Sequence, residues 1–396
     1  MDFEYKIKEQ VQNLLPEYIN FLSEFVKFDS FYCNEKEAQL FVKNKMELLG
    51  LAPQIYFSRN DEQAINLAVT IKGSENQKYK SLILNSHCDI TPVDTPSRWE
   101  KPPFSGVVEN NILYGRGSLD DKAGITIILL IANLLKNMEI KLKGDLILES
   151  VIEDETTGNG SKTLVENGLS ADGVIIIDGT WSERIIYAHL GQLTLDIFIQ
   201  GEPVAACVEY RGINPIYIGM EFIQKVKDFI DELNKNQPKF ENIEKSYYIN
   251  VGSFHSGTWS GSVPAEAKLE IHLGFSEYFT PEQIFSRVKE IANSISERIQ
   301  VKEALLKTPA FRTDADSYLI GKLKKTIEKN SNKEVLVIPI TGFSDMRHFK
   351  TKNVCLYGPG GGKNPHGINE HYFLEQMPNV VKNLTDFILE WCNEPK

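Results

Sequence analysis

The sequence predicts an α/β fold: a larger domain on a mostly parallel sheet, interrupted by a smaller inserted α+β domain. Its first half alternates helical segments with short, almost entirely apolar runs, as strands buried on both faces do. Near residue 185 the pattern changes to alternating strands and amphipathic helices, and it changes back after about residue 303. An insert within a discontinuous domain produces this order.

The larger domain begins with two helix-periodic segments, 6–27 and 34–49. An apolar helix is predicted over 123–137, directly after a Gly-Arg-Gly turn. Strand, crossover helix and strand in succession are typical of a parallel sheet. The expected buried strands are 65–71, 81–86, 145–152 and 173–178.

The insert alternates polar and apolar residues in its strands, as strands with one exposed face do. Its expected elements are strands 193–201, 245–252 and 265–275 and helices 212–235 and 281–298. The larger domain then resumes with helices 316–329 and 374–391 around strands 335–340 and 354–358. We therefore assign residues 1–184 and 303–396 to the larger domain and 185–302 to the insert.

Composition excludes several classes of protein. The 396 residues are 42% hydrophobic and 24% charged, as in an ordinary globular protein of two domains. The net charge of −11 argues against nucleic acid and anionic membranes as partners. No stretch approaches the ~18 apolar residues of a membrane span, and the N-terminus has no apolar export segment. Five scattered cysteines are typical of a reduced compartment, so we expect a cytoplasmic protein.

Histidines and carboxylates follow the ends of the apolar runs, and such strand ends meet at one edge of a parallel sheet. Each residue alone has an ordinary alternative: Asp120 could cap a helix, Asp178 could sit in a turn, and His366 could be a surface residue. Together they offer what a pair of divalent metals needs, with one carboxylate shared. This predicts a two-metal hydrolase. The expected ligands are His87, Asp120, Glu155, Asp178 and His366.

Neighbouring residues suggest supporting roles. Asp89 shares a strand face with His87 and can accept the second imidazole N–H, which fixes the tautomer. Glu153, Asp154 and Glu155 place three carboxylates at one strand end. One of them can bind a metal while a neighbour acts as general base.

The stretch SHCDITPVDTPSRWEKPPFSGVVENNILYGRGSLDDKAG resembles a long signature of the di-zinc amidohydrolases and peptidases. That family includes acetylornithine deacetylase, succinyl-diaminopimelate desuccinylase, aminoacylase and carboxypeptidase G, and the resemblance covers nearly the whole chain. GTWSGSVPAEAKLEIHLGF resembles the lid segment of the branch that contains formylaminopyrimidine deformylase.

The resemblance implies individual roles for the site residues. His87 and His366 would be terminal ligands of the two metals, Asp120 would bridge them, and Glu155 and Asp178 would complete one shell each. The family's general base falls on Asp154, and Arg347 would lie near the carboxylate of the substrate. The insert would be a lid and dimerisation domain.

Three departures from the family pattern stand out. The base is usually glutamate, and Asp154 is one methylene shorter, so Glu153 is an alternative. The lid histidine that reaches the scissile carbonyl across the dimer has no counterpart, because residues 190–254 contain no histidine. The branch's lid arginine position holds His272. His272 and His255 are therefore candidates for the missing oxyanion donor.

These observations support hydrolysis of an amide in a small N-acyl amine, N-acyl amino acid or short peptide. The alternative is a metal-binding homologue with lost or altered chemistry, such as ligand binding or acyl transfer. Zinc suits the nitrogen and oxygen ligands, and cobalt or manganese also fits. We expect a homodimer, because the insert's sheet, with helices on one side, leaves an exposed edge strand that a second copy can pair.

Overall fold

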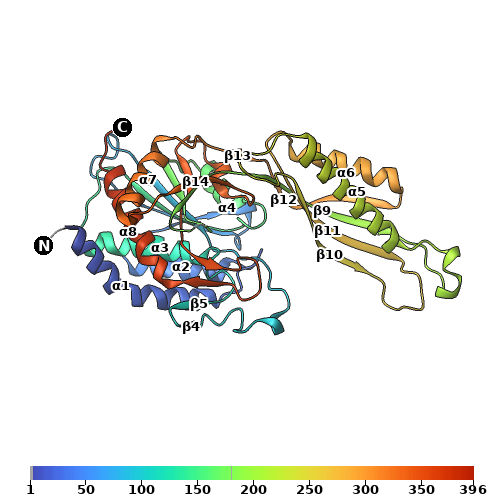
Figure 1. Ribbon diagram of the computed structural model, residues 1–396. Coiled ribbons are helices and arrows are strands. Elements are labelled where there is room, and N and C mark those ends of the chain that lie inside the picture. Colours follow the sequence, from blue (N-terminus) through green and yellow to red (C-terminus); the bar gives the residue numbers. More distant parts are fainter. Residues whose placement is uncertain (1–2, 180) are drawn as a thin grey trace. The chain divides into compact units, whose positions relative to one another are not determined.

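The computed structural model describes residues 3–179 and 181–396. The described chain divides into two compact units (Figure 1). The larger unit comprises Met1–Tyr187 as far as it is described, Thr313–Ile338 and Ser344–Lys396. The smaller unit comprises Ala188–Arg312 and Pro339–Phe343. The family roles of the two units as catalytic and lid domains stay predictions.

A nine-stranded sheet forms the centre of the larger unit. Its middle strands β6 (Leu146–Val151), β3 (Leu82–His87), β7 (Gly173–Ile176) and β15 (Val354–Leu356) run parallel to one another. Antiparallel strands flank them: β1 (Gln54–Phe57) and β2 (Ile65–Ile71) on one side and β8 (Arg184–His189) on the other. Strand β8 also pairs with β13 (Phe311–Arg312), which runs antiparallel to it, and with β14 (Leu336–Ile340).

The register of the central strands brings their carboxyl ends together. His87 at the end of β3 lies opposite Val151 at the end of β6, and Asn85 lies opposite Ile176 at the end of β7. The residues that follow these strands therefore start from one edge of the sheet, where ligands bind in α/β folds.

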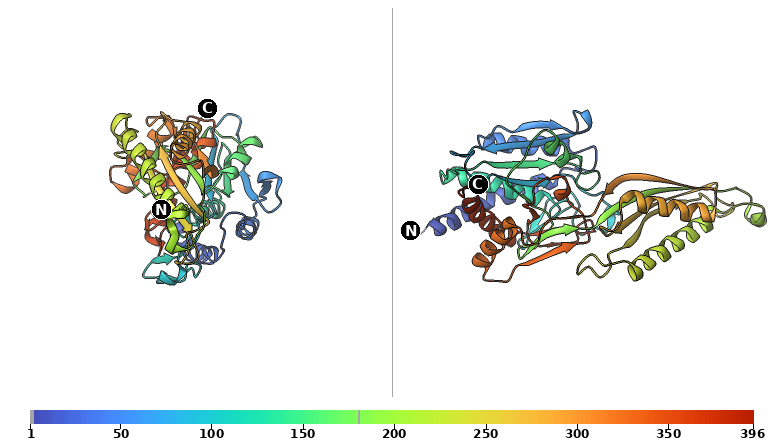
Figure 2. Two further views of the ribbon diagram at one scale, coloured as in Figure 1. Left: turned by 90° about the vertical axis from the view of Figure 1, so that its right-hand side faces the viewer. Right: turned by 90° about the horizontal axis from the view of Figure 1, so that it is seen from above.

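Helices cover this sheet (Figures 1 and 2). Helix α3 (Lys122–Asn137) packs against β3, α1 and α8, and its residues from Lys122 to Leu135 are all buried. A helix enclosed in this way is apolar all round, which explains its sequence. The other helices of this unit are α1 (Phe3–Val26), α2 (Lys36–Leu48), α4 (Asn159–Glu166), α7 (Tyr318–Ser331) and α8 (Met377–Trp391).

A small sheet joins two distant loops of the larger unit. It has the order β16-β17-β5-β4 and ties the segment after the first long loop to the C-terminal glycine-rich segment. Its strands are β4 (Val108–Glu109), β5 (Ile112–Tyr114), β16 (Gly362–Lys363) and β17 (His371–Phe373). Short 3-10 turns are η1 (Ser58–Asn60), η2 (Pro96–Arg98), η4 (Asp345–His348) and η5 (Leu374–Gln376).

The smaller unit is a four-stranded antiparallel sheet of order β10-β11-β9-β12, with α5 and α6 side by side on one face (Figures 1 and 2). Alternate residues of β9, from Leu193 to Ile199, point into the core against both helices. Thr280 and Gln283 form a capping box that starts α6. The elements are β9 (Gly191–Gln200), η3 (Ala206–Arg211), α5 (Pro215–Asn236), β10 (Tyr248–Ser256), β11 (Glu266–Phe275), α6 (Pro281–Ile295) and β12 (Ile299–Thr308).

The predicted fold class is confirmed: an α/β unit on a mostly parallel sheet is accompanied by a smaller α+β unit. Strands β8 and β12 and the small sheet were not predicted from the sequence. Strand β12 continues the insert's sheet to Thr308, so the smaller unit extends beyond residue 302. No helix in the described part of the chain is long and apolar enough to cross a membrane.

Candidate metal centre

Two groups of potential metal ligands lie at the carboxyl edge of the central sheet. The first is His87, Asp120 and Asp178, and the second is Asp120, Glu155 and His366. Within each group the ligand atoms lie within 4.8 Å of one another. Asp120 belongs to both groups, so its carboxylate would be shared if each group held a cation. The structure therefore brings together all five residues that the sequence suggested as ligands.

The two oxygens of Asp120 face different imidazoles. Asp120 Oδ1 lies 3.2 Å from His87 Nε2, and Asp120 Oδ2 lies 3.1 Å from His366 Nε2. Burial opposes ionisation of Asp120, but the two imidazoles outweigh it and hold the pKa of this carboxyl below its usual range. An ionised carboxylate with its oxygens directed to both sides is arranged as a bridging ligand.

Glu370 fixes the backbone at Asp120, a role that sequence analysis missed. Its Oε1 accepts hydrogen bonds from the backbone N–H groups of Leu119 (3.1 Å) and Asp120 (3.2 Å). Its Oε2 pairs with the buried guanidinium of Arg116 at 2.6 Å. Because Glu370 lies four residues after His366, its hydrogen bonds also hold the loop of His366 next to Asp120. In the sequence, the sign of this role was an acidic residue in the glycine-rich motif that contains His366.

Asp89 connects His87 to the turn after β6. Its Oδ1 lies 3.3 Å from His87 Nδ1 and accepts the backbone N–H of Asp154 at 3.2 Å. Its Oδ2 accepts the backbone N–H of Glu155 at 3.0 Å. This geometry supports the predicted orienting role and adds a second one, since Asp89 also holds two residues of the acidic turn.

The three acids of that turn have different surroundings. Glu155 Oε1 lies 2.9 Å from His366 Nε2, within the second ligand group. Asp154 Oδ2 lies 4.0 Å from His87 Nε2, and burial followed by the charge of Asp345 raises its pKa well above the usual range. Glu153 is fully buried and forms an ion pair with Arg59, with 3.0 Å between Nη1 and Oε1.

The fit to metal ions can be tested on the polar atoms. His87 Nε2 and Glu155 Oε1 are buried, and neither makes a hydrogen bond within the described residues. Both nevertheless lie 2.9–3.2 Å from a ligand atom of a neighbouring residue. Buried polar atoms that converge without hydrogen bonding suit coordination of a common cation. Two imidazoles and three carboxylates match the preferences of zinc, cobalt and manganese.

Electrostatics also favour positive charge at this edge. Burial, followed by the charge of Asp120, raises the pKa of Asp178 to about 7. The Glu155 carboxylate raises the pKa of His366 to about 12, against its partial burial. Carboxylates that crowd together in this way repel one another, and a divalent cation between them removes the repulsion.

Arg347 lies in the larger unit, on η4. Its guanidinium is almost buried, with Nη2 3.6 Å from Asp345 Oδ1 and Nη1 donating to the backbone oxygen of Ser344. It packs on Gly158, where an added Cβ would come within 2.1 Å of Nη2. Contact with a substrate carboxylate stays a prediction.

His272 and His255 belong to the smaller unit. His272 lies on β11, with Nε2 2.7 Å from Gln192 Oε1 and its ring stacked on Tyr248 at 6.0 Å. His255 lies on β10 opposite Lys268. Their predicted role as oxyanion donors is a property of a working site and stays a prediction.

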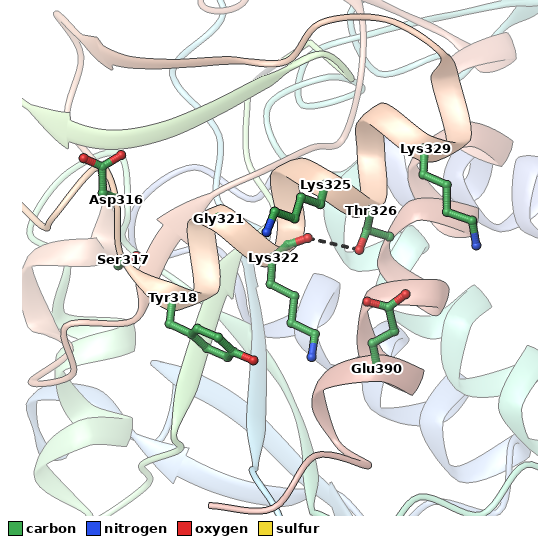
Figure 3. Close-up of a pocket in the computed structure, with 9 residues that line it drawn as sticks. All are labelled: Asp316, Ser317, Tyr318, Gly321, Lys322, Lys325, Thr326, Lys329 and Glu390. Carbon is green, nitrogen blue, oxygen red and sulfur yellow. Dashed lines mark hydrogen bonds between the residues drawn. The ribbon is translucent and has the colours of Figure 1, made fainter.

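A surface pocket of about 450 Å³ lies elsewhere on the larger unit, along α7 (Figure 3). Lys322, Lys325 and Lys329 line it on α7, and Glu390 of α8 faces them. It includes none of the predicted site residues. Two of its lysines already have partners, since Lys322 pairs with Glu394 at 2.6 Å and Lys329 with Glu4 at 2.9 Å.

A central sheet with acids and imidazoles grouped at the carboxyl ends of its parallel strands suits a metal-dependent hydrolase. The chain belongs to peptidase family M20/M25/M40, whose model matches residues 83–390. N-formyl-4-amino-5-aminomethyl-2-methylpyrimidine deformylase of Halalkalibacterium halodurans is 27% identical, over 91% of this chain and 90% of that protein. A probable succinyl-diaminopimelate desuccinylase of Staphylococcus aureus is 24% identical, over 96% of this chain and 98% of that protein.

Solved structures show the same fold. A di-peptidase of Saccharomyces cerevisiae superposes with a TM-score of 0.83 at 13% identity, over 100% of this chain and 99% of that one. An M20 family metallo-carboxypeptidase of Sulfolobus solfataricus superposes with a TM-score of 0.77 at 19% identity, over 95% of this chain and 99% of that one. The predicted family is confirmed. As a member of it, the chain is a metal-dependent enzyme that hydrolyses amide bonds in small acyl amines or peptides.

Proposed function

We propose that this enzyme is a two-metal deacylase that removes a small acyl group from an amine nitrogen. The observation that carries the proposal is the pair of ligand groups sharing Asp120, with the carboxylate of Asp154 beside them. The relatives at 24–27% identity are a deformylase and a probable desuccinylase, which favours an N-acyl amine over a dipeptide. The likeness to dipeptidases is one of fold.

We assign His87 and Asp178 to one cation, Glu155 and His366 to the other, and Asp120 to both. Divalent cations, when bound, polarise the amide carbonyl and lower the pKa of the attacking water. Zinc is our assignment for both, with cobalt and manganese as substitutes of similar ligand preference.

Asp154 is our choice of general base. Its carboxylate takes the proton of the attacking water and passes it to the leaving nitrogen. Glu153 is the weaker candidate, because its carboxylate is already engaged by Arg59, Thr157 and Asn159. Asp89 keeps His87 in one tautomer throughout, since His87 Nδ1 lies 3.1 Å from its backbone oxygen and 3.3 Å from its carboxylate.

The proposal is tested by loading purified protein with zinc, cobalt or manganese and assaying N-formyl, N-acetyl and N-succinyl amines beside dipeptides. We expect turnover of at least one acyl amine and a preference for it over the dipeptides. A protein that binds two equivalents of metal and hydrolyses none of these compounds would support the altered-chemistry alternative.

We also propose that the enzyme is a homodimer that pairs through its smaller unit. Strands β10 and β12 are the edges of that unit's four-stranded sheet, and a second copy can cover an edge that would otherwise invite unspecific pairing. Light scattering at micromolar concentration should give twice the mass of the 44.9 kDa chain. A monomer would contradict the proposal.

His272 or His255 should supply the oxyanion donor that the family's lid histidine provides elsewhere. Removing one such donor typically lowers kcat ~10²–10³-fold. Replacing each by alanine should therefore reduce kcat for only one of the two, with metal content unchanged, and the other variant serves as the control. Unchanged kcat in both variants would remove these residues from the mechanism.

A further inference from the structure

The turn that presents Asp154 and Glu155 begins with an unusual residue. Glu153 has a φ of +66°, a left-handed conformation that is uncommon for a side chain of this size. Its carboxylate is fully buried, although it lies at the end of a strand next to two polar residues. A buried charge on a strained backbone persists only where surrounding groups fix it.

The partner of Glu153 comes from a distant part of the chain. Arg59, in turn η1 between β1 and β2, places Nη1 3.0 Å from Glu153 Oε1. This guanidinium also lies over the Tyr32 ring, with Cζ 5.0 Å from the ring centroid. About a quarter of the Arg59 side chain is exposed, whereas Glu153 is enclosed. Arg59 therefore closes the solvent side of the buried carboxylate.

The second oxygen of Glu153 holds the residues that follow the turn. Glu153 Oε2 accepts hydrogen bonds from Thr157 Oγ1 and from Asn159 Nδ2, the latter at 3.2 Å. The backbone oxygen of Glu153 accepts the N–H of Gly158 at 2.7 Å. One side chain thus joins η1 to both ends of the 153–159 turn.

Asp89 and Arg59 hold the acidic turn at different points. Asp89 accepts the backbone N–H groups of Asp154 and Glu155. Arg59 fixes the preceding residue, where the left-handed kink turns the chain out of β6. Without Arg59, only the hydrogen bonds from Thr157, Asn159 and Gly158 hold Glu153 in this conformation, and the directions of the next two side chains are less firmly fixed.

We propose that Arg59 is a positioning residue: through its ion pair with Glu153 it directs Asp154 and Glu155 toward the metal centre. The inference rests on the proposed function for the roles of Asp154 and Glu155. It assigns to Arg59 no contact with the substrate. A displacement of ~1 Å in a catalytic group can cost ~10²-fold in rate, and this sets the expected effect.

The first test replaces Arg59 in the zinc-loaded enzyme. Arg59→Ala should lower kcat ~10²-fold with KM within about twofold, because the base moves while substrate binding is kept. Arg59→Lys keeps a cation on the same side and should recover kcat to within about tenfold of the wild type, despite losing the planar fork. Arg298→Ala is the matched control, since Arg298 pairs with the exposed Glu202 at 3.4 Å.

A double variant separates positioning from simple neutralisation. Arg59→Ala leaves the buried Glu153 unpaired and should lower Tm, whereas Arg59→Ala with Glu153→Gln removes that charge and should restore Tm. Positioning predicts that kcat stays low in the double variant. Recovery of kcat together with Tm would overturn the proposal, as would an Arg59→Ala enzyme with wild-type kcat.

A spectroscopic readout keeps the test independent of activity. The visible absorption of the cobalt-substituted protein reports the ligand geometry to which Glu155 would contribute. Arg59→Ala should change this spectrum, and Arg298→Ala should leave it as in the wild type. If the wild type binds cobalt but hydrolyses no acyl amine, the proposed function fails, and an unchanged Arg59→Ala spectrum would separately refute the positioning role.

Discussion

The two candidate ligand groups of the proposed metal centre are carried by different kinds of backbone. His87 is the last residue of β3 and Asp178 lies two residues beyond β7, so neighbouring strands hold both. Glu155 lies in a turn, and His366 lies in the loop between β16 and β17 with a φ of +60°. The His87 side chain is 3% exposed, and that of His366 is 52% exposed.

This difference separates a strand half of the centre, with His87 and Asp178, from a loop half, with Glu155 and His366. We expect the two halves to bind metal differently. The strand half is enclosed and preorganised, because regular hydrogen bonds and packing fix its ligands before any cation binds. The loop half depends on backbone geometry that other residues must enforce, namely Glu370 at one end of its loop and Arg59 at the acidic turn. We expect its cation to exchange more readily and the substrate to approach from its side.

The largest expected effect comes from Asp120, which joins the halves. Asp120→Ala removes a ligand from both groups and leaves His87 and His366 without their common carboxylate. Metal content should fall below one equivalent and hydrolysis to background, as elemental analysis and the acyl-amine assay would show. Asp228→Ala on the exposed face of α5 is the control. Two retained equivalents in Asp120→Ala would refute the shared-ligand arrangement.

Asp154 should affect chemistry without affecting metal content. Asp154→Asn removes the proton acceptor and should reduce kcat by ~10²–10⁴, with two metal equivalents still bound. Asp154→Glu restores the acid usual in the family and should keep kcat within about tenfold of the wild type. If Asp154→Asn retains full activity, the base is another group, and Glu153→Gln then becomes the variant to assay.

Much of this centre could be predicted from the sequence. The five candidate ligands and Asp89 each stand at the end of an apolar run or in a glycine-rich motif, and the carboxyl ends of parallel strands meet in space. Strand 65–71 was predicted at its observed bounds, because its apolar run has clear polar limits. Family resemblance supplied the individual roles.

The remaining features depend on contacts between distant residues. Arg59 is one arginine in a polar loop, and no local pattern shows that it meets Glu153, 94 positions later. Glu370 likewise meets Leu119 and Asp120 only in the folded chain. Strand β12 was missed because its alternation is broken, with a register shift between Glu303 and Lys307. Tertiary contacts decide such elements.

The loop half should also release its metal before the strand half does. A chelator titration of the zinc enzyme should remove one equivalent first, and His366→Ala should retain the other. His87→Ala should lose the tighter equivalent, because its ligand group is the buried one. Affinity differences of ~10–100-fold are expected from altered support of the ligands. Simultaneous loss of both metals in the wild type and in His366→Ala would contradict the expected difference in metal affinity between the strand half and the loop half.

The smallest expected effects are changes in stability. They compare a glycine next to the strand half with a glycine in a helix far from it. Gly124 in α3 packs beneath this half: an added Cβ would meet Ile177 O and Ser86 Oγ at 2.5 Å and Asp121 Oδ1 at 2.6 Å. Gly321 in α7 borders the pocket of Figure 3, and a Cβ there would meet no atom within 4 Å. Gly124→Ala should lower the free energy of unfolding by ~1–3 kcal/mol through overpacking. Gly321→Ala should raise it by about 0.5 kcal/mol, because alanine loses less backbone entropy in a helix.

Denaturant unfolding of the apoproteins measures both changes, and hydrolysis by the zinc-loaded enzymes provides the second readout. Gly124→Ala should also weaken metal binding, since the Asp121 side chain and the Ile177 backbone that it displaces belong to residues next to Asp120 and Asp178. Gly321→Ala should keep wild-type kcat and metal content. A tolerated Gly124→Ala with unchanged metal affinity would show that the strand half adapts as readily as the loop half, and the contrast between them would then rest on solvent exposure alone.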